Sequence, residues 1–224
     1  IELGESRAWG WQQGCMLQWV PGTGADVLWN DREGDRHVCR LLDIQTRERR
    51  TLDRPMYTLS PDGAFGLSIN FARLQVLRPG YGYVGLPDPF ADELAPKDDG
   101  VFRVNLASGA AELILPLAQV AKIPYEGALL TDVWHYFNHL LISPDARRFI
   151  VLHRWRRRDP DTGAPTGGFI TRMITANVDG SDVFVLDPSG NTSHFIWRDP
   201  EHVCMWTRPE GRKAAFYLFR DRTR

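Results

Sequence analysis

Cysteine, net charge and long apolar runs are all scarce in this chain of 224 residues, and each scarcity excludes a class of protein. The 3 cysteines are odd in number and far apart, which argues against a disulfide framework or a Cys-x-x-Cys metal site. The 27 Lys and Arg nearly balance 28 Asp and Glu, so we expect no nucleic-acid partner. No apolar run reaches the roughly 18 residues that a membrane-spanning helix needs, so we expect no membrane partner.

Several catalytic motifs are also missing. The chain has no glycine-rich phosphate loop, no Gly-x-Ser-x-Gly sequence and no His-Glu-x-x-His sequence. Nucleotide hydrolysis, serine hydrolysis and zinc peptidase chemistry therefore lack sequence support. The isolated cysteines favour a reducing compartment, so we expect a cytoplasmic protein. Because the chain opens at Ile1 without methionine, a cleaved signal peptide and a periplasmic location are the alternative.

What the sequence has instead is a repeat of short apolar segments separated by turn sequences such as Ser60-Pro61-Asp62-Gly63. Four segments can be aligned as equivalent first strands: 16–22, 56–62, 139–145 and 194–200. Their starting residues are 40, 83 and 55 positions apart, which brackets the roughly 40 to 50 residues of a propeller blade. Loops at 78–100 and 117–137, the second with room for a short helix, lengthen the middle interval.

This pattern predicts an all-β fold, a β-propeller of which about four blades of four-stranded antiparallel sheet are present. We treat residues 1–224 as a single propeller domain. One blade cannot cover both faces of its own sheet, so an array of blades needs either ring closure or further blades at its ends. We therefore expect this chain to be part of a longer propeller, incomplete at one or both ends.

Histidines occupy two of the four equivalent positions, which are Met16, Met56, His139 and His194. The first strand of a propeller blade lines the central channel, so His139 and His194 should approach each other there. Counting back from the turn after Ser143 pairs His139 with His153 across two strands.

Three imidazoles in one place would suit a divalent metal. Structural hydrogen bonds from these histidines to loop carbonyls are the alternative.

Other polar side chains near this point are candidates for binding substrate. His135 lies in an aromatic stretch that could stack on a sugar ring, although packing in the core is the alternative. Arg154 and Arg156 follow His153 and could hold a carboxylate, although such a run is also common in solvated loops.

The segments 138–144, 151–155, 179–180 and 193–197 together resemble the oligogalacturonate lyases, which are seven-bladed propellers. These enzymes degrade pectin fragments by β-elimination, using a divalent metal held by histidines and a glutamine. The resemblance covers about residues 138–206. It implies His139 as the catalytic base and His153 and His194 as metal ligands, with Asn191 where the family's glutamine falls. Manganese is the candidate metal.

The sequence therefore predicts a lyase-like propeller that cleaves uronic-acid-containing oligosaccharides by metal-assisted β-elimination, with a small oligosaccharide as its partner. The alternative is a non-catalytic propeller of the TolB or WD40-like kind that serves as a binding platform for a protein or a glycan. A metal-dependent hydrolase or epimerase on the same scaffold is a third reading, because a histidine cluster does not choose between proton abstraction and water activation.

Overall fold

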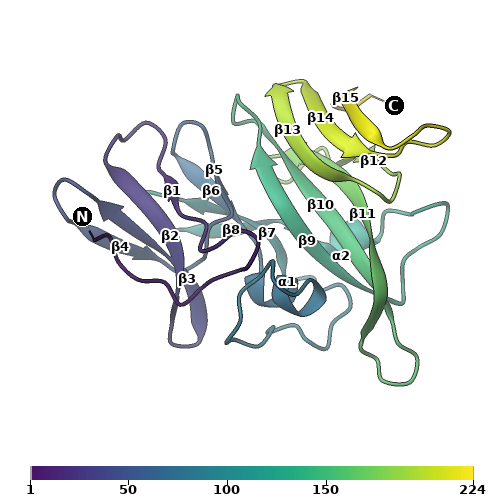
Figure 1. Ribbon diagram of the computed structural model, residues 1–224, viewed down its shortest axis with the longest axis horizontal. Helices are drawn as coiled ribbons and strands as arrows, with labels where there is room; N and C mark the ends of the chain where they lie inside the picture. Colours follow the sequence, from purple (N-terminus) through teal and green to yellow (C-terminus); the bar gives the residue numbers. More distant parts are fainter. Residues whose placement is uncertain (1, 224) are drawn as a thin grey trace.

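A computed structural model describes residues 2–223, and almost all of its regular structure is β-strand. The strands form three four-stranded sheets and one three-stranded sheet in this described part. Within each sheet every strand pairs antiparallel with the next strand along the chain. Figure 1 shows the sheets side by side, from the N-terminal sheet on the left to the C-terminal sheet at the upper right. The predicted all-β architecture of about four repeated sheets is confirmed.

The four sheets follow one another along the chain. The first contains β1 (Gln18–Trp19), β2 (Asp26–Glu33), β3 (Arg36–Asp43) and β4 (Arg49–Leu52). The second contains β5 (Thr58–Leu59), β6 (Phe65–Ser68), β7 (Gly100–Asn105) and β8 (Ala111–Pro116). The third contains β9 (Val133–Ile142), β10 (Arg148–Arg158), β11 (Pro165–Asn177) and β12 (Phe184–Asp187). The last contains β13 (Ser193–Asp199), β14 (His202–Thr207) and β15 (Ala215–Arg220). The four predicted first-strand segments overlap β1, β5, β9 and β13.

Two short helices interrupt the strands. α2 (Leu117–Ala121) lies in the loop where the sequence predicts a short helix. α1 (Phe71–Leu77) was not predicted; it begins after Asn70, whose side chain accepts a hydrogen bond from the backbone N–H of Arg73. No helix within residues 2–223 is long and apolar enough to cross a membrane.

Apolar side chains fill the spaces between neighbouring sheets. Leu28 and Leu41 of the first sheet contact a buried cluster that includes Met56 and Val104 of the second. Ile150 of the third sheet and Val203 of the fourth belong to another such cluster. Since a sheet covered on one face only leaves apolar surface in water, each sheet depends on its neighbours for burial.

The repeated turns share one hydrogen-bond pattern. Ser60 Oγ donates to Asp62 and accepts from the backbone N–H of Phe65 at 3.1 Å. Ser143 Oγ likewise donates to Asp145 at 2.6 Å and accepts from the backbone N–H of Arg148 at 2.9 Å. The Ser-Pro-Asp sequence therefore forms a local structure that recurs because its own side chains satisfy the turn's backbone.

The predicted pairing of His139 with His153 is wrong. Phe149 lies opposite Ile142 where the prediction placed Ser143, and the register then slips again between Val151 and Leu152. His153 is consequently opposite Phe137. The cause is an additional residue on β9, and a slip of one residue moves a side chain to the other face of a sheet.

We expect Ser143→Ala to lower the free energy of unfolding by about 1–2 kcal/mol, because it removes two hydrogen bonds from a buried turn. Urea titration followed by circular dichroism measures this change. Ser108→Ala, in an exposed turn with comparable hydrogen bonds, is the control and should lower it by less. Equal losses in both variants would contradict a special role for the repeated turn.

Candidate ligand-binding site

The backbone is left-handed at three of the four equivalent first-strand positions. The φ angle is 56° at Met16, 50° at His139 and 36° at His194. Residues other than glycine seldom adopt such angles. At both histidines the strand register shifts, which makes each of them the additional residue of a β-bulge. Bulges re-aim a side chain out of the regular alternation, and both imidazoles line the same cavity.

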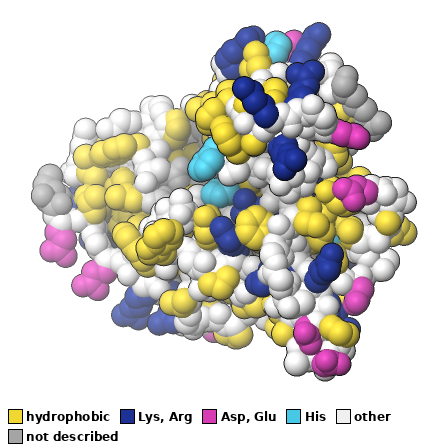
Figure 2. All heavy atoms as spheres, turned by 45° about the vertical axis from the view of Figure 1, so that its right-hand side comes forward, with side chains coloured by type: hydrophobic (Ala, Val, Ile, Leu, Met, Phe, Trp, Pro, Cys, Tyr) yellow, Lys and Arg dark blue, Asp and Glu magenta, His cyan; other side chains and the backbone are white. Residues whose placement is uncertain are grey.

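This cavity, which we call the central cavity, has a volume of about 540 Å³. Four of the predicted site residues line it: His139, His194, Arg154 and Asn191. Figure 2 shows histidine side chains in the hollow between the two sides of the molecule, with Lys or Arg side chains beside them. Cavities of this size accommodate small ligands such as short oligosaccharides.

Two arginines give the central cavity its positive charge. Arg154 comes from β10 and Arg78 from the C-terminal end of α1, and both guanidinium groups lie over the ring of Phe169, at 4.6 and 4.3 Å from its centroid. None of the described residues that line the cavity is Asp or Glu. The two positive charges therefore have no acidic counterpart within the cavity.

Each of these arginines also has an unsatisfied donor. Arg154 is 4% exposed; its Nε donates to Thr171 Oγ1 at 3.0 Å, while its Nη1 is buried and has no partner in the described structure. Nε of Arg78 is likewise buried without a partner there. Burial lowers the pKa of Arg154, and the charge of Arg78 acts in the same direction. An anion in the cavity would supply the opposite charge that the lining lacks.

His139 is held by a hydrogen-bond network at one wall. Its Nδ1 lies 3.0 Å from the hydroxyl of Tyr57, which donates to Oε1 of Gln13 at 2.7 Å. The backbone N–H of His139 donates to the same hydroxyl at 3.1 Å. Burial lowers the pKa of His139 to about 3, and the charge of Arg154 adds to this effect. The imidazole is therefore neutral at physiological pH.

His153 and His135 lie outside the central cavity. Both are on the opposite face of the third sheet, where their rings are parallel with centroids 5.1 Å apart. Alternation along β10 explains this placement, because Arg154 and His153 are consecutive and must point to opposite faces. The structure thus brings neither the predicted metal histidine nor the predicted sugar-stacking histidine to the cavity.

The buried histidines form a chain of hydrogen bonds with a fixed direction. Arg172 Nε donates to His153 Nδ1 at 3.0 Å, so the proton of His153 is on Nε2 and is donated to His135 Nδ1 at 2.9 Å. His135 in turn donates from Nε2 to the carbonyl of Leu130 at 3.0 Å. Both nitrogens of His153 are occupied within the protein. This is the structural role that sequence reasoning held open as the alternative.

The predicted metal ligands do not fit a common metal site. His153 is fully buried with both nitrogens bonded, which leaves only His194 and Asn191 on the cavity wall from the predicted set. Among residues 2–223 no three His, Cys, Asp or Glu side chains are grouped as metal ligands. Most protein metal sites use three or four such ligands.

Arg156 also differs from its predicted role as a substrate ligand. Its Nη2 donates to the carbonyl of Gly167 at 2.7 Å and its Nη1 to that of Leu77 at 3.5 Å. The side chain joins α1 to the hairpin of β10 and β11 and does not line the central cavity. Arg156 therefore connects two segments of the backbone, and it is not among the residues that line the central cavity.

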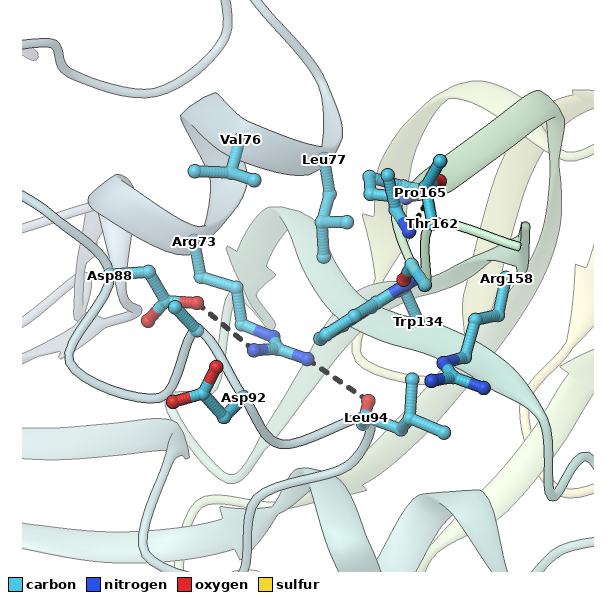
Figure 3. Close-up of a pocket in the computed structure, with 13 residues that line it drawn as sticks. Arg73, Val76, Leu77, Asp88, Asp92, Leu94, Trp134, Arg158, Thr162 and Pro165 are labelled. Atoms are coloured by element: carbon cyan, nitrogen blue, oxygen red, sulfur yellow. Dashed lines mark hydrogen bonds and ion pairs between the residues drawn. The ribbon is translucent and has the colours of Figure 1, made fainter. Parts of the chain in front are cut away.

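A second cavity of about 510 Å³ lies between α1 and the β10–β11 hairpin (Figure 3). Two arginines, Arg73 and Arg158, line it, and Arg73 points from α1 toward Trp134 and is already satisfied (Figure 3). Nη1 of Arg73 donates to Asp88 and Nη2 to the carbonyl of Leu94, at 3.0 and 2.9 Å, and Nε donates to the carbonyl of His135 at 2.8 Å. This arginine ties the 88–94 loop to the sheet, and Asp88 and Asp92 in the lining oppose the binding of an anion, unlike the central cavity.

Sequence reasoning missed Arg78, Gln13 and Tyr57. Arg78 opens the loop 78–100 that the sequence marks as long, which was the only signal available for it. Gln13 lies in an N-terminal segment with no motif, and Tyr57 directly follows Met56 in the aligned repeat. Only folding brings these three residues, far apart in the chain, to one cavity.

Comparison with known proteins supports the fold class. An acylaminoacyl peptidase, solved in complex with Z-Gly-Gly-Phe-chloromethyl ketone, has a TM-score of 0.52 at 14% identity, over 92% of this chain and 31% of the peptidase. TolB from Acinetobacter baumannii has a TM-score of 0.47 at 12% identity, over 96% of this chain and 42% of TolB. An oligogalacturonate lyase in complex with manganese has a TM-score of 0.37 at 14% identity, over 90% of this chain and 64% of the lyase.

The repeated antiparallel sheets are blades of a β-propeller-like fold, and the similarity to the acylaminoacyl peptidase goes no further than the fold. This chain spans less than two thirds of the length of each of the three proteins. No protein-family model and no curated protein sequence matches it. The chain therefore belongs to the β-propeller fold class and contains a cationic cavity.

The buried histidines predict a loss of stability in mild acid. The pKa values of His37 and His135 are both lowered by burial to about 4 and that of His139 to about 3, and that of His153 is lowered well below its usual value by the same cause. The unfolded chain takes up these protons below a pH of about 6.5, whereas the folded chain does not. Stability is therefore complete above this pH and falls below it.

We expect the free energy of unfolding to fall by about 1.4 kcal/mol per pH unit for each of these histidines between about pH 6 and pH 5. Urea titrations at several pH values measure the slope. His139→Gln removes one of the four groups and should reduce the slope by about one such increment. An unfolding free energy that does not change between pH 7 and pH 5 would contradict neutral burial.

Proposed function

We propose that the central cavity binds a uronic-acid-containing oligosaccharide through its carboxylate. The observation that carries this proposal is the pair of guanidinium groups of Arg78 and Arg154 in a cavity without an acidic lining residue. Guanidinium groups bind carboxylates in a planar, two-pronged geometry.

Binding is favoured over catalysis as the primary function. His139 has a pKa of about 3, so it is neutral but a weak base at physiological pH. General bases work best when their pKa lies near the operating pH. A neutral imidazole beside two arginines is well suited to recognise a ligand, which agrees with the alternative of a non-catalytic binding propeller.

We expect Arg154→Gln to weaken the binding of trigalacturonate by about ten- to hundredfold, because a charge-assisted hydrogen bond contributes about 1.5–3 kcal/mol. Isothermal titration calorimetry measures the dissociation constant. Arg156→Gln is the matched control, since Arg156 lies on the same strand but outside the cavity, and it should leave the constant nearly unchanged.

The ligand series provides a second control for this experiment. A neutral oligosaccharide of the same length should bind at least tenfold more weakly than the uronide to the native protein. Thermal unfolding of each variant checks that the fold persists. Equal binding of the charged and neutral sugars, or equal losses in the two arginine variants, would overturn the proposal.

Cleavage by β-elimination is a second candidate, favoured by the position of His139 in the same cavity as the two arginines. In this reaction Arg154 neutralises the uronate carboxylate. His139 removes the proton from the ring carbon to which that carboxylate is attached. The electron pair left behind forms a carbon–carbon double bond, and the glycosidic oxygen leaves and is protonated. The predicted metal ligands do not form a site, so the arginines carry the charge neutralisation in this scheme.

We expect elimination, where it occurs, to raise the ultraviolet absorbance of a trigalacturonate solution as the conjugated double bond forms. His139→Gln should lower that rate by about a hundredfold or more, since a general base contributes about that factor. His202→Gln, at the surface outside the cavity, is the control. Parallel reactions with added manganese and with chelator test the metal dependence. If trigalacturonate binds but the absorbance does not change, elimination is contradicted and only the binding function remains.

A further inference from the structure

The hydroxyl of Tyr57 lies at the junction of three segments of the chain. Tyr57, which directly precedes β5, is 5% exposed. Its ring stacks on that of Phe71, the first residue of α1, with ring centroids 5.7 Å apart. Its oxygen lies 2.7 Å from Gln13 Oε1, 3.0 Å from His139 Nδ1 and 3.4 Å from Asn138 Oδ1. Burial raises the pKa of Tyr57 above its usual value, so the phenol keeps its proton.

The location of that single proton decides the tautomer of His139. The contact of 2.7 Å joins two oxygens, and the amide oxygen of Gln13 has no proton to give, so Tyr57 must donate. The phenol oxygen can then only accept from His139, at Nδ1 as well as at the backbone N–H. Gln13 Nε2 is farther from Nδ1, at 3.4 Å. The proton of the neutral ring is consequently on Nδ1.

The other ring nitrogen of His139 is left with a lone pair. Nε2 has no hydrogen-bond partner among the described residues and does not belong to their enclosed, unsatisfied atoms. The ring itself lines the central cavity between Tyr57 and Tyr81, edge to face with both. The cavity therefore presents donors at its arginines and an acceptor at His139.

We propose that Tyr57 is a positioning residue that holds His139 in the Nδ1–H tautomer, so that the cavity selects a carboxylate accompanied by a hydroxyl group. The arginines take the carboxylate and Nε2 accepts the hydroxyl hydrogen. Uronic acids carry this combination. The ligand half of the inference rests on the proposed function, whereas the tautomer does not.

The tautomer is tested first, on the native protein without ligand. Nitrogen-15 chemical shifts of the imidazole distinguish a protonated ring nitrogen from one with a lone pair. We expect His139 to have its proton on Nδ1, and Tyr57→Phe to shift it toward the Nε2–H form because the acceptor at Nδ1 is lost. A native His139 with its proton on Nε2 would overturn the inference, whether or not the variant folds.

The ligand half is tested by competition against labelled trigalacturonate. Galacturonate is compared with tetrahydropyran-2-carboxylate, which keeps the ring and the carboxylate but has no hydroxyl groups. We expect native protein to prefer galacturonate by about tenfold, and His139→Phe to lose most of that preference.

The outcomes separate the two proposals. If trigalacturonate itself does not bind, the proposed function fails while the tautomer result stands on its own. If both competitors bind equally well, or if His139→Phe keeps the full preference, carboxylate binding stands and hydroxyl selection by His139 is overturned.

Discussion

The left-handed backbone at His139 is the constraint on which the rest of the site depends. With φ at 50°, this residue is the additional one in β9 and is not paired across the strand. Its imidazole therefore leaves the regular alternation and reaches the central cavity, while its backbone N–H donates to Tyr57 at 3.1 Å. A non-glycine residue in this region costs free energy, so hydrogen bonds from its neighbours must hold it there.

The same bulge separates the histidines into two groups with different physics. One group faces the cavity beside arginines whose donors are not satisfied. The other, His135 with His153, is closed off by Arg172 and a backbone carbonyl in a chain where every nitrogen has a defined role. Histidines of the third sheet thus line the cavity on one face and form a buried hydrogen-bond chain on the other.

The acceptors and charges that surround the buried arginines differ between the two cavities. Arg73 is at least as buried as Arg154, but its donors are satisfied by Asp88 and by backbone carbonyls. Arg154 and Arg78 lie in a lining without carboxylates, and no acidic side chain of that lining neutralises their charge. The contrast shows why a buried arginine by itself does not mark a binding site; the number of acceptors already supplied by the protein decides it.

The sequence by itself determined the all-β class, the recurring Ser-Pro-Asp turns, the order of the first strands and the equivalence of His139 with His194, because alternation and turn chemistry are local. It also predicted four of the residues that line the cavity. Only the tertiary structure decided that His139 and His153 take opposite faces, because a bulge of one residue at His139 reverses the sides of β9 and leaves no mark in the apolar pattern. The same holds for Gln13, Tyr57 and Arg78, which meet through contacts between distant segments that no local period encodes.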